Sequence, residues 1–170
     1  MKPSSISLTE RLILAQQSRI LAAVHPEQRE DHIFVAEVFE NGFTDFYGDA
    51  FTAITPELGE QDSRYVSKIM GIYLEIQYWY DNRLTEEERK EIGSVAFPGF
   101  DGNDTEDIYR ARFARFCMQH GRYQSLKCMG SDLNSHMPVG RKYADMIRRY
   151  EEMGNPRELT ADQIKNVMGR

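Results

Sequence analysis

Carboxylate and amide oxygens gather in one short polar loop of the sequence, at Asp101, Asn103 and Asp104. Such oxygens are the ligands that a hard cation such as calcium prefers. An EF-hand loop that began at Asp101 would need a glycine at its sixth position and a glutamate at its twelfth. This sequence has Glu106 and Arg112 at those two positions. We therefore predict no metal site and no cofactor.

The same loop also has a structural interpretation, which we favour. Phe97 and Phe100 are expected to fill a core, and the glycines between and after them permit a tight turn. Asp104 or the next residue then caps the helix that follows. Asp101 and Asn103 nevertheless remain candidates for binding a ligand.

A second polar loop contains Asn134, Ser135 and His136. A neutral imidazole beside a hydroxyl suits general-base chemistry. In most loop conformations, however, adjacent residues cannot share the hydrogen bond that a catalytic triad needs. The sequence also lacks a phosphate loop, a Gly-x-Ser-x-Gly elbow and a His-Glu-x-x-His motif. We predict no catalytic residues and favour a protein that is not an enzyme.

If the two loops meet, they form a polar pocket. A small-molecule binder or an enzyme built on this pocket is our second hypothesis. Its candidate residues for binding a ligand or partner are Asp101, Asn103, Arg115, Arg122, Asn134 and His136.

The charges are distributed unevenly along the chain. The net charge is −6, but residues 1–104 hold 9 Lys and Arg against 19 Asp and Glu, and residues 105–170 hold 12 against 8. An acidic chain is not a typical nucleic-acid binder, because such proteins are usually basic. The basic C-terminal half could still bind nucleic acid, and this is our third, less favoured hypothesis. The simpler interpretation is a dipolar molecule whose halves attract each other or a second copy.

Two helical segments have features of an interface. Ile13, Gln17, Ile20 and Val24 follow the spacing of a coiled-coil seam, in which a polar residue such as Gln17 can fix the register. A core glutamine bonded to a neighbouring carbonyl is the alternative. The candidate interface residues are Gln17 and the consecutive aromatics Tyr78, Trp79 and Tyr80.

Helix signals dominate the rest of the chain. Capping boxes are expected at Ser7, Thr85 and Thr160, each followed three residues later by Glu or Gln. No useful stretch alternates polar and apolar residues as a strand does, so we predict an all-α bundle of about seven or eight helices. The expected helices span about 8–24, 26–41, 47–54, 60–82, 86–93, 106–120, 138–153 and 161–168, and the segment 122–129 is a candidate for one further short helix.

Composition and length indicate an ordinary globular chain. A length of 170 residues suits one domain over 1–170, and two cysteines, Cys117 and Cys128, are too few for a disulfide framework. No apolar run reaches the roughly 20 residues of a membrane span. We expect a cytoplasmic protein with no membrane association.

Several segments together resemble the YfbU family, small bacterial helical proteins with no established biochemical function. The resemblance rests on Leu8–Leu14, Glu40–Phe43, Phe97–Asp101, Gly121–Tyr123, Asn134–His136 and Leu159–Asp162, which occur in family order over most of the chain. It implies an all-helical cytoplasmic protein and supplies no catalytic residue. Some members look fused to a DNA-binding ribbon-helix-helix module, and no such segment is expected here.

These observations lead to one preferred hypothesis. We predict a non-catalytic interaction or regulatory protein that acts through helix surfaces and associates with itself as a homo-oligomer. A different protein partner would fit the same surfaces. The polar pocket and the basic half are the two alternatives.

Overall fold

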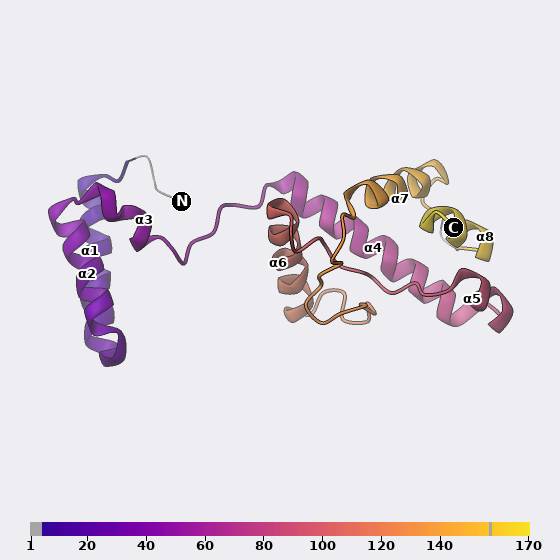
Figure 1. Cartoon of the computed structure of the whole chain (residues 1–170), viewed down its shortest axis with the longest axis horizontal. Helices are drawn as coiled ribbons and strands as arrows, with labels where there is room; N and C mark the ends of the chain where they lie inside the picture. The colour runs from indigo at the N-terminus through magenta and orange to yellow at the C-terminus, as the bar shows by residue number, and fades with distance from the viewer. Residues whose placement is uncertain (1–4, 157) are drawn as a thin grey trace. The chain divides into compact units, whose positions relative to one another are not determined.

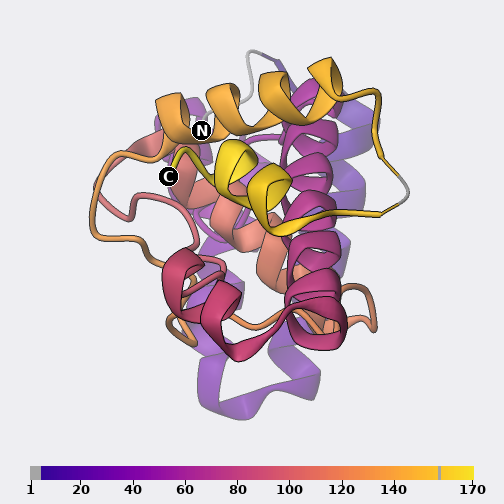
Figure 2. The same cartoon turned by 90° about the vertical axis from the view of Figure 1, so that its right-hand side faces the viewer.

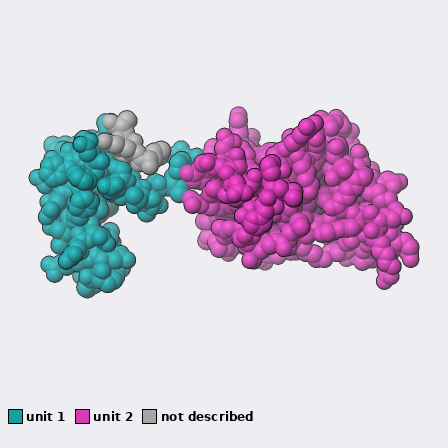
Figure 3. All heavy atoms as spheres, viewed as in Figure 1, with its two compact units in different colours: residues 1–57 teal, residues 58–170 magenta. Residues whose placement is uncertain are grey.

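The computed structural model describes residues 5–156 and 158–170, and within them it contains eight α-helices and no strand. The predicted all-α fold is confirmed. The chain divides into two compact units, residues 1–57 and 58–170, which are coloured separately in Figure 3. The expected single domain over 1–170 stays a prediction.

Unit 1 is a helical hairpin followed by a short helix (Figure 1). α1 (Leu8–Val24) packs against α2 (Arg29–Asn41), and α3 (Tyr47–Ala50) packs on α2. The Ser7 hydroxyl accepts a hydrogen bond from the Glu10 amide, while the Glu10 carboxylate accepts one from the Ser7 amide, so the predicted capping box is present. The third helix was expected to reach residue 54, but it ends at Ala50.

Unit 2 is built on the long α4 (Glu60–Arg83). Around it lie α5 (Glu86–Ile92), α6 (Thr105–Gln119), α7 (Gly140–Glu152) and α8 (Ala161–Met168). α6 and α7 pack on α4, and α8 packs on both α7 and α5, as Figure 2 also shows. The capping boxes predicted at Thr85 and Thr160 are present.

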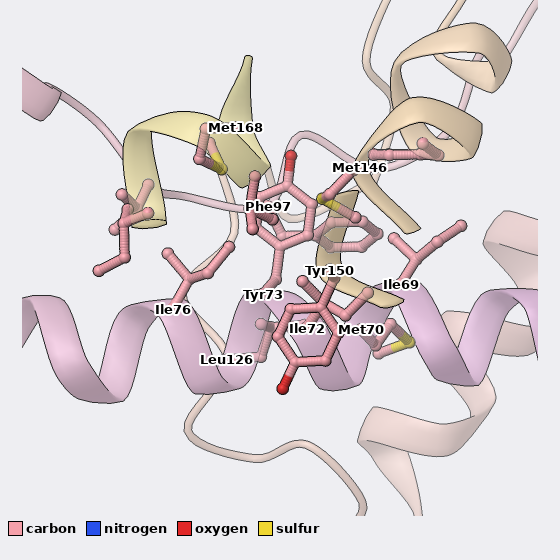
Figure 4. Packing of buried hydrophobic residues seen from close by; sticks show 14 of the residues in the cluster. Ile69, Met70, Ile72, Tyr73, Ile76, Phe97, Leu126, Met146, Tyr150 and Met168 are labelled. Atoms are coloured by element: carbon pink, nitrogen blue, oxygen red, sulfur yellow. The ribbon is translucent and has the colours of Figure 1, made fainter. Parts of the chain in front are cut away.

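The core of unit 2 lies along one face of α4, as its spacing predicts. Ile69, Ile72 and Ile76 are buried there, and they face α7, α8 and the loop at Phe97 (Figure 4). Tyr65 and Trp79, at the two ends of the same stripe, are half-buried. Apolar residues four and three apart share one side of a helix, so burial of this side holds the unit together.

The candidate helix over 122–129 does not form. Tyr123 has a φ of 54°, a left-handed conformation that breaks a right-handed helix. The Met129 amide is bonded to the Phe97 carbonyl, and the Phe97 amide to the Lys127 carbonyl, so this segment pairs with a distant loop instead. None of the described helices is long and apolar enough to cross a membrane.

Candidate functional site

The loop after α5 is held by short backbone pairing to the segment before α7. Phe97 forms an isolated parallel bridge with Cys128, and Phe100 forms another with Asn134. Both phenylalanine side chains are fully buried. The two polar loops of the sequence therefore do meet, and the structural role predicted for the two aromatic residues is confirmed.

Gly99 sits where the two segments cross most closely. Its φ is +88°, and a Cβ atom there would lie 2.0 Å from the carbonyl oxygen of Leu133. The Tyr143 hydroxyl donates a hydrogen bond to the Gly99 carbonyl from the core side. Only glycine fits this position, because any side chain would overlap the neighbouring backbone.

The carboxylates of the first loop are engaged in local hydrogen bonds. The buried Asp101 accepts from the backbone and side-chain amides of Asn103 through Oδ1, at 3.0 and 3.1 Å. Asp104 Oδ1 accepts from the Asp107 amide at 2.9 Å and so caps α6. Of the two caps predicted for this helix, Asp104 is confirmed. Among the described residues no group of three or more His, Cys, Asp or Glu side chains could hold a metal ion.

Asn134 joins the two loops directly. Its Oδ1 accepts from the Gly102 amide at 3.0 Å and from the His136 amide at 2.9 Å. The Ser135 hydroxyl donates its proton to the Met137 carbonyl at 2.7 Å and not to the exposed His136 imidazole. This loop leads into a helix and is not arranged as a serine–histidine pair.

The predicted pocket residues are only partly brought together. Arg115 and Asn134 line one cavity of about 220 Å³, and the Arg115 guanidinium donates to the Asp132 carbonyl at 2.6 Å. Asp101 lines a separate cavity of about 220 Å³. Asn103, Arg122 and His136 are exposed and are not among the lining residues of either cavity.

The chain also matches a known protein family over nearly its whole length. The model of the YfbU domain matches residues 4–169, which is nearly the whole chain. The chain belongs to the YfbU family. It is also similar to UPF0304 protein MJECS11 of Methanocaldococcus jannaschii, with 28% identity over 169 residues that cover 96% of this chain and 98% of the relative. That relative is archaeal, so a bacterial source for this chain stays a prediction.

The seam predicted on α1 of this YfbU chain faces solvent within unit 1. We use "α1 seam" for Ile13, Gln17, Ile20 and Val24. Gln17 is exposed, and Ile13, Ile20 and Val24 are 48, 62 and 63% exposed. The opposite side of α1 is the buried one, and its buried residues are Ala15, Ser18 and Ala22. Gln17 is therefore not a core glutamine of the hairpin.

The three consecutive aromatics of α4 behave differently from one another. Tyr78 is 57% exposed and packs edge-on against Trp79, at 5.3 Å between ring centroids. Trp79 and Tyr80 are half-buried against the core, and the Tyr80 hydroxyl donates to the Arg89 carbonyl at 3.2 Å. Tyr78 is thus the member of this set most available to a partner.

Several cations of the basic half are paired with carboxylates. Arg110 bonds Asp62 at 2.6 Å and Asp107 at 2.8 Å, and these hydrogen bonds outweigh its burial and raise its pKa. Lys127 pairs with Asp81 at 2.6 Å. Asp62 and Asp81 both lie in the acidic half, so these two ion pairs join the acidic and basic parts of the sequence within unit 2. The sequence did not indicate the pair of Arg110 with Asp62, because these two residues are 48 positions apart.

The two cysteines are not arranged for redox chemistry. Cys117 is buried, Cys128 is half-buried, and both are free thiols. Burial raises the pKa of each thiol, although the charge of Arg122 partly opposes this at Cys117. A raised pKa keeps a thiol protonated and poorly nucleophilic.

Proposed function

We propose that this YfbU chain is a non-catalytic interaction or regulatory protein that associates with itself through the α1 seam. The exposed, charge-free face of α1 is the observation that carries the proposal. We propose the cytoplasm as its compartment, because a reducing environment suits two free thiols.

Unit 1 leaves many apolar side chains exposed that a partner could bury. Its buried cluster is small and consists of Ala15, Val38, Phe39 and Tyr47. More large apolar side chains are exposed than buried, including Leu8, Leu12, Ile13, Ile20, Leu21, Val24, Phe34, Phe43, Phe46 and Ile54. Exposed apolar side chains that adjoin one another, as those of the α1 seam do on one side of the helix, commonly mark an interaction site.

A second copy of the same chain is the occupant that we propose. The α1 seam contains three aliphatic side chains and one amide, and none of its members carries a charge. A charged face would repel its own copy, whereas an uncharged apolar stripe is complementary to itself. Gln17 can then pair with polar groups of the partner and fix the register of the two helices.

Mixing a tagged and an untagged form of the full chain tests this proposal. We expect the untagged copy to be retained with the tagged copy, and Ile20→Glu in both copies to abolish retention, because it buries charge in an apolar contact. Leu8→Glu is the matched control, since it places the same charge on an exposed leucine elsewhere on α1. Retention that survives Ile20→Glu, or no retention of the natural chain, would overturn the proposal.

A further inference from the structure

A cavity in unit 2 combines cationic and apolar walls. Its volume is about 220 Å³, and it lies between α6 and the residues just before α7. Arg112 and Arg115 contribute from α6, and Asp132 and Asn134 contribute from the loop. The remaining lining residues are Phe100, Gly102, Ile108, Ala111 and Leu133.

Hydrogen-bond donors predominate among the polar groups of this cavity. Arg115 donates one N–H to the Asp132 carbonyl, at 2.6 Å. Because a guanidinium has five N–H donors, others remain for a ligand. The guanidinium carbon of Arg112 lies over the ring of Tyr109, 5.6 Å from the ring centroid, and this contact leaves the N–H groups of Arg112 available. The Asn134 side chain accepts two hydrogen bonds, both at Oδ1, so its Nδ2 group remains available as a donor.

Gly102 makes room for the Asn134 amide at the edge of the cavity. A Cβ atom on Gly102 would lie 2.5 Å from Asn134 Nδ2. The missing side chain therefore allows the carboxamide to approach the Gly102 backbone and to bond its amide N–H. The donor end of Asn134 is positioned by this contact.

The charges of the lining favour an anion. The lining contains two guanidinium groups and one carboxylate, that of Asp132, and Asp132 Oδ1 already accepts from the Asn134 backbone amide at 3.2 Å. One positive charge is left over. We infer that this cavity is a binding site for a small organic anion that carries a carboxylate or phosphate group, held by Arg112, Arg115 and Asn134.

The size and the apolar walls narrow the ligand class further. Pockets for drug-sized ligands usually occupy about 300–1,000 Å³, and this cavity is smaller, at about 220 Å³. Ile108, Ala111 and Leu133 offer contact for a short aliphatic portion. The planar guanidinium groups suit carboxylate and phosphate oxygens in a two-pronged geometry. A short-chain carboxylate or a small phosphate ester fits better than a nucleotide.

Titration of the full chain with inorganic phosphate and, separately, with butyrate tests this inference. The titration is followed by amide NMR. We expect saturable chemical-shift changes at the amides of Gly102 and Asn134 with at least one of the two probes. The probe that saturates at the lower concentration identifies the anionic group. Arg112→Gln is expected to weaken binding about tenfold or more, because it removes one of the two guanidinium groups in the lining. The fold should persist, since the contact described for Arg112 is with Tyr109 on the same helix. Arg148→Gln is the matched control, since Arg148 pairs with Asp145 and Glu152 on α7 and is absent from the cavity lining.

Arg115→Lys adds a second test that separates charge from geometry. Lysine keeps the charge but lacks the planar fork, so we expect weaker binding with little change in melting temperature. If neither probe saturates up to about 10 mM, a concentration at which even a millimolar site would be nearly filled, the inference is wrong. It is equally wrong if Arg112→Gln binds the probes as tightly as the control Arg148→Gln does.

Discussion

The side chain of Gln77 and the backbone of Lys127 are joined by two hydrogen bonds that run in opposite directions. Gln77 Nε2 donates to the Lys127 carbonyl at 2.8 Å, and the Lys127 amide donates to Gln77 Oε1 at 2.8 Å. Gln77 Nε2 also donates to the Val95 carbonyl at 3.0 Å. One buried amide on α4 thus fixes both of the loops that build the cavity region.

Gln77→Leu is expected to destabilise unit 2 by about 2–4 kcal/mol, because it leaves buried backbone groups without partners. Trp79, the chain's sole tryptophan, lies two residues away and reports on this unit in urea unfolding followed by fluorescence. Gln61→Leu on exposed α4 surface is the control and should change the free energy of unfolding by about 0.5 kcal/mol or less. Equal effects of the two changes would refute the bridging role.

Gly99→Ala is expected to cost about 3 kcal/mol or more, since its Cβ would overlap the Leu133 carbonyl at 2.0 Å. Gly71→Ala on α4 is the matched control, because a Cβ there meets nothing within 4 Å. That control should raise stability by about 0.5–1 kcal/mol, as alanine favours a helix over glycine. Thermal unfolding of both variants checks the opposite signs, and a shared sign would count against the close crossing at Gly99.

Arg110→Met should destabilise unit 2 by about 2 kcal/mol, because the Asp107 side chain is only 8% exposed and would lose its cation. Arg64→Met removes an exposed pair with Glu60 and should cost about 0.5 kcal/mol or less. The comparison uses the same urea unfolding experiment. A cost for Arg64→Met as large as that for Arg110→Met would show that burial does not set these energies.

Unit 2 should unfold in alkali. Burial raises the pKa of Tyr73 from 10.0 to about 12, and its hydroxyl has no hydrogen-bond partner in the described structure. The unfolded chain releases this proton first, so the stabilisation is complete below pH 10 and is lost as the pH rises toward about 12. Tyrosinate absorbance and helical circular dichroism should change together in this range for natural protein. In Tyr73→Phe the helical signal should persist to higher pH, and an unchanged alkaline midpoint would contradict the assignment.

Local signals in the sequence were sufficient for most helix ends. The capping boxes at Ser7, Thr85 and Thr160 are each formed within four residues, so no distant contact is needed to predict them. The segment at 122–129 was misjudged because its structure depends on pairing with Phe97. Composition alone does not reveal such long-range pairing.

The candidate site was predictable in its parts but not in its grouping. The sequence indicated that the loops at Asp101 and Asn134 are unusual, yet their spacing carries no information on which side chains share a cavity. Gln77 was overlooked, although a glutamine four residues after the buried Tyr73 is a polar residue on a buried helix face. That pattern is a usable signal, because buried amides require partners.

Light scattering on a sizing column, at low and high salt and over a range of concentrations, tests the central claim most directly. The proposal predicts a defined oligomer of the natural chain whose mass does not fall as salt rises, because apolar contacts are not screened. Ile20→Glu should convert it to a monomer of 19.8 kDa, while Leu8→Glu should not. A natural chain that remains a monomer at every concentration, or that releases bound nucleic acid as salt rises, would contradict association through the α1 seam.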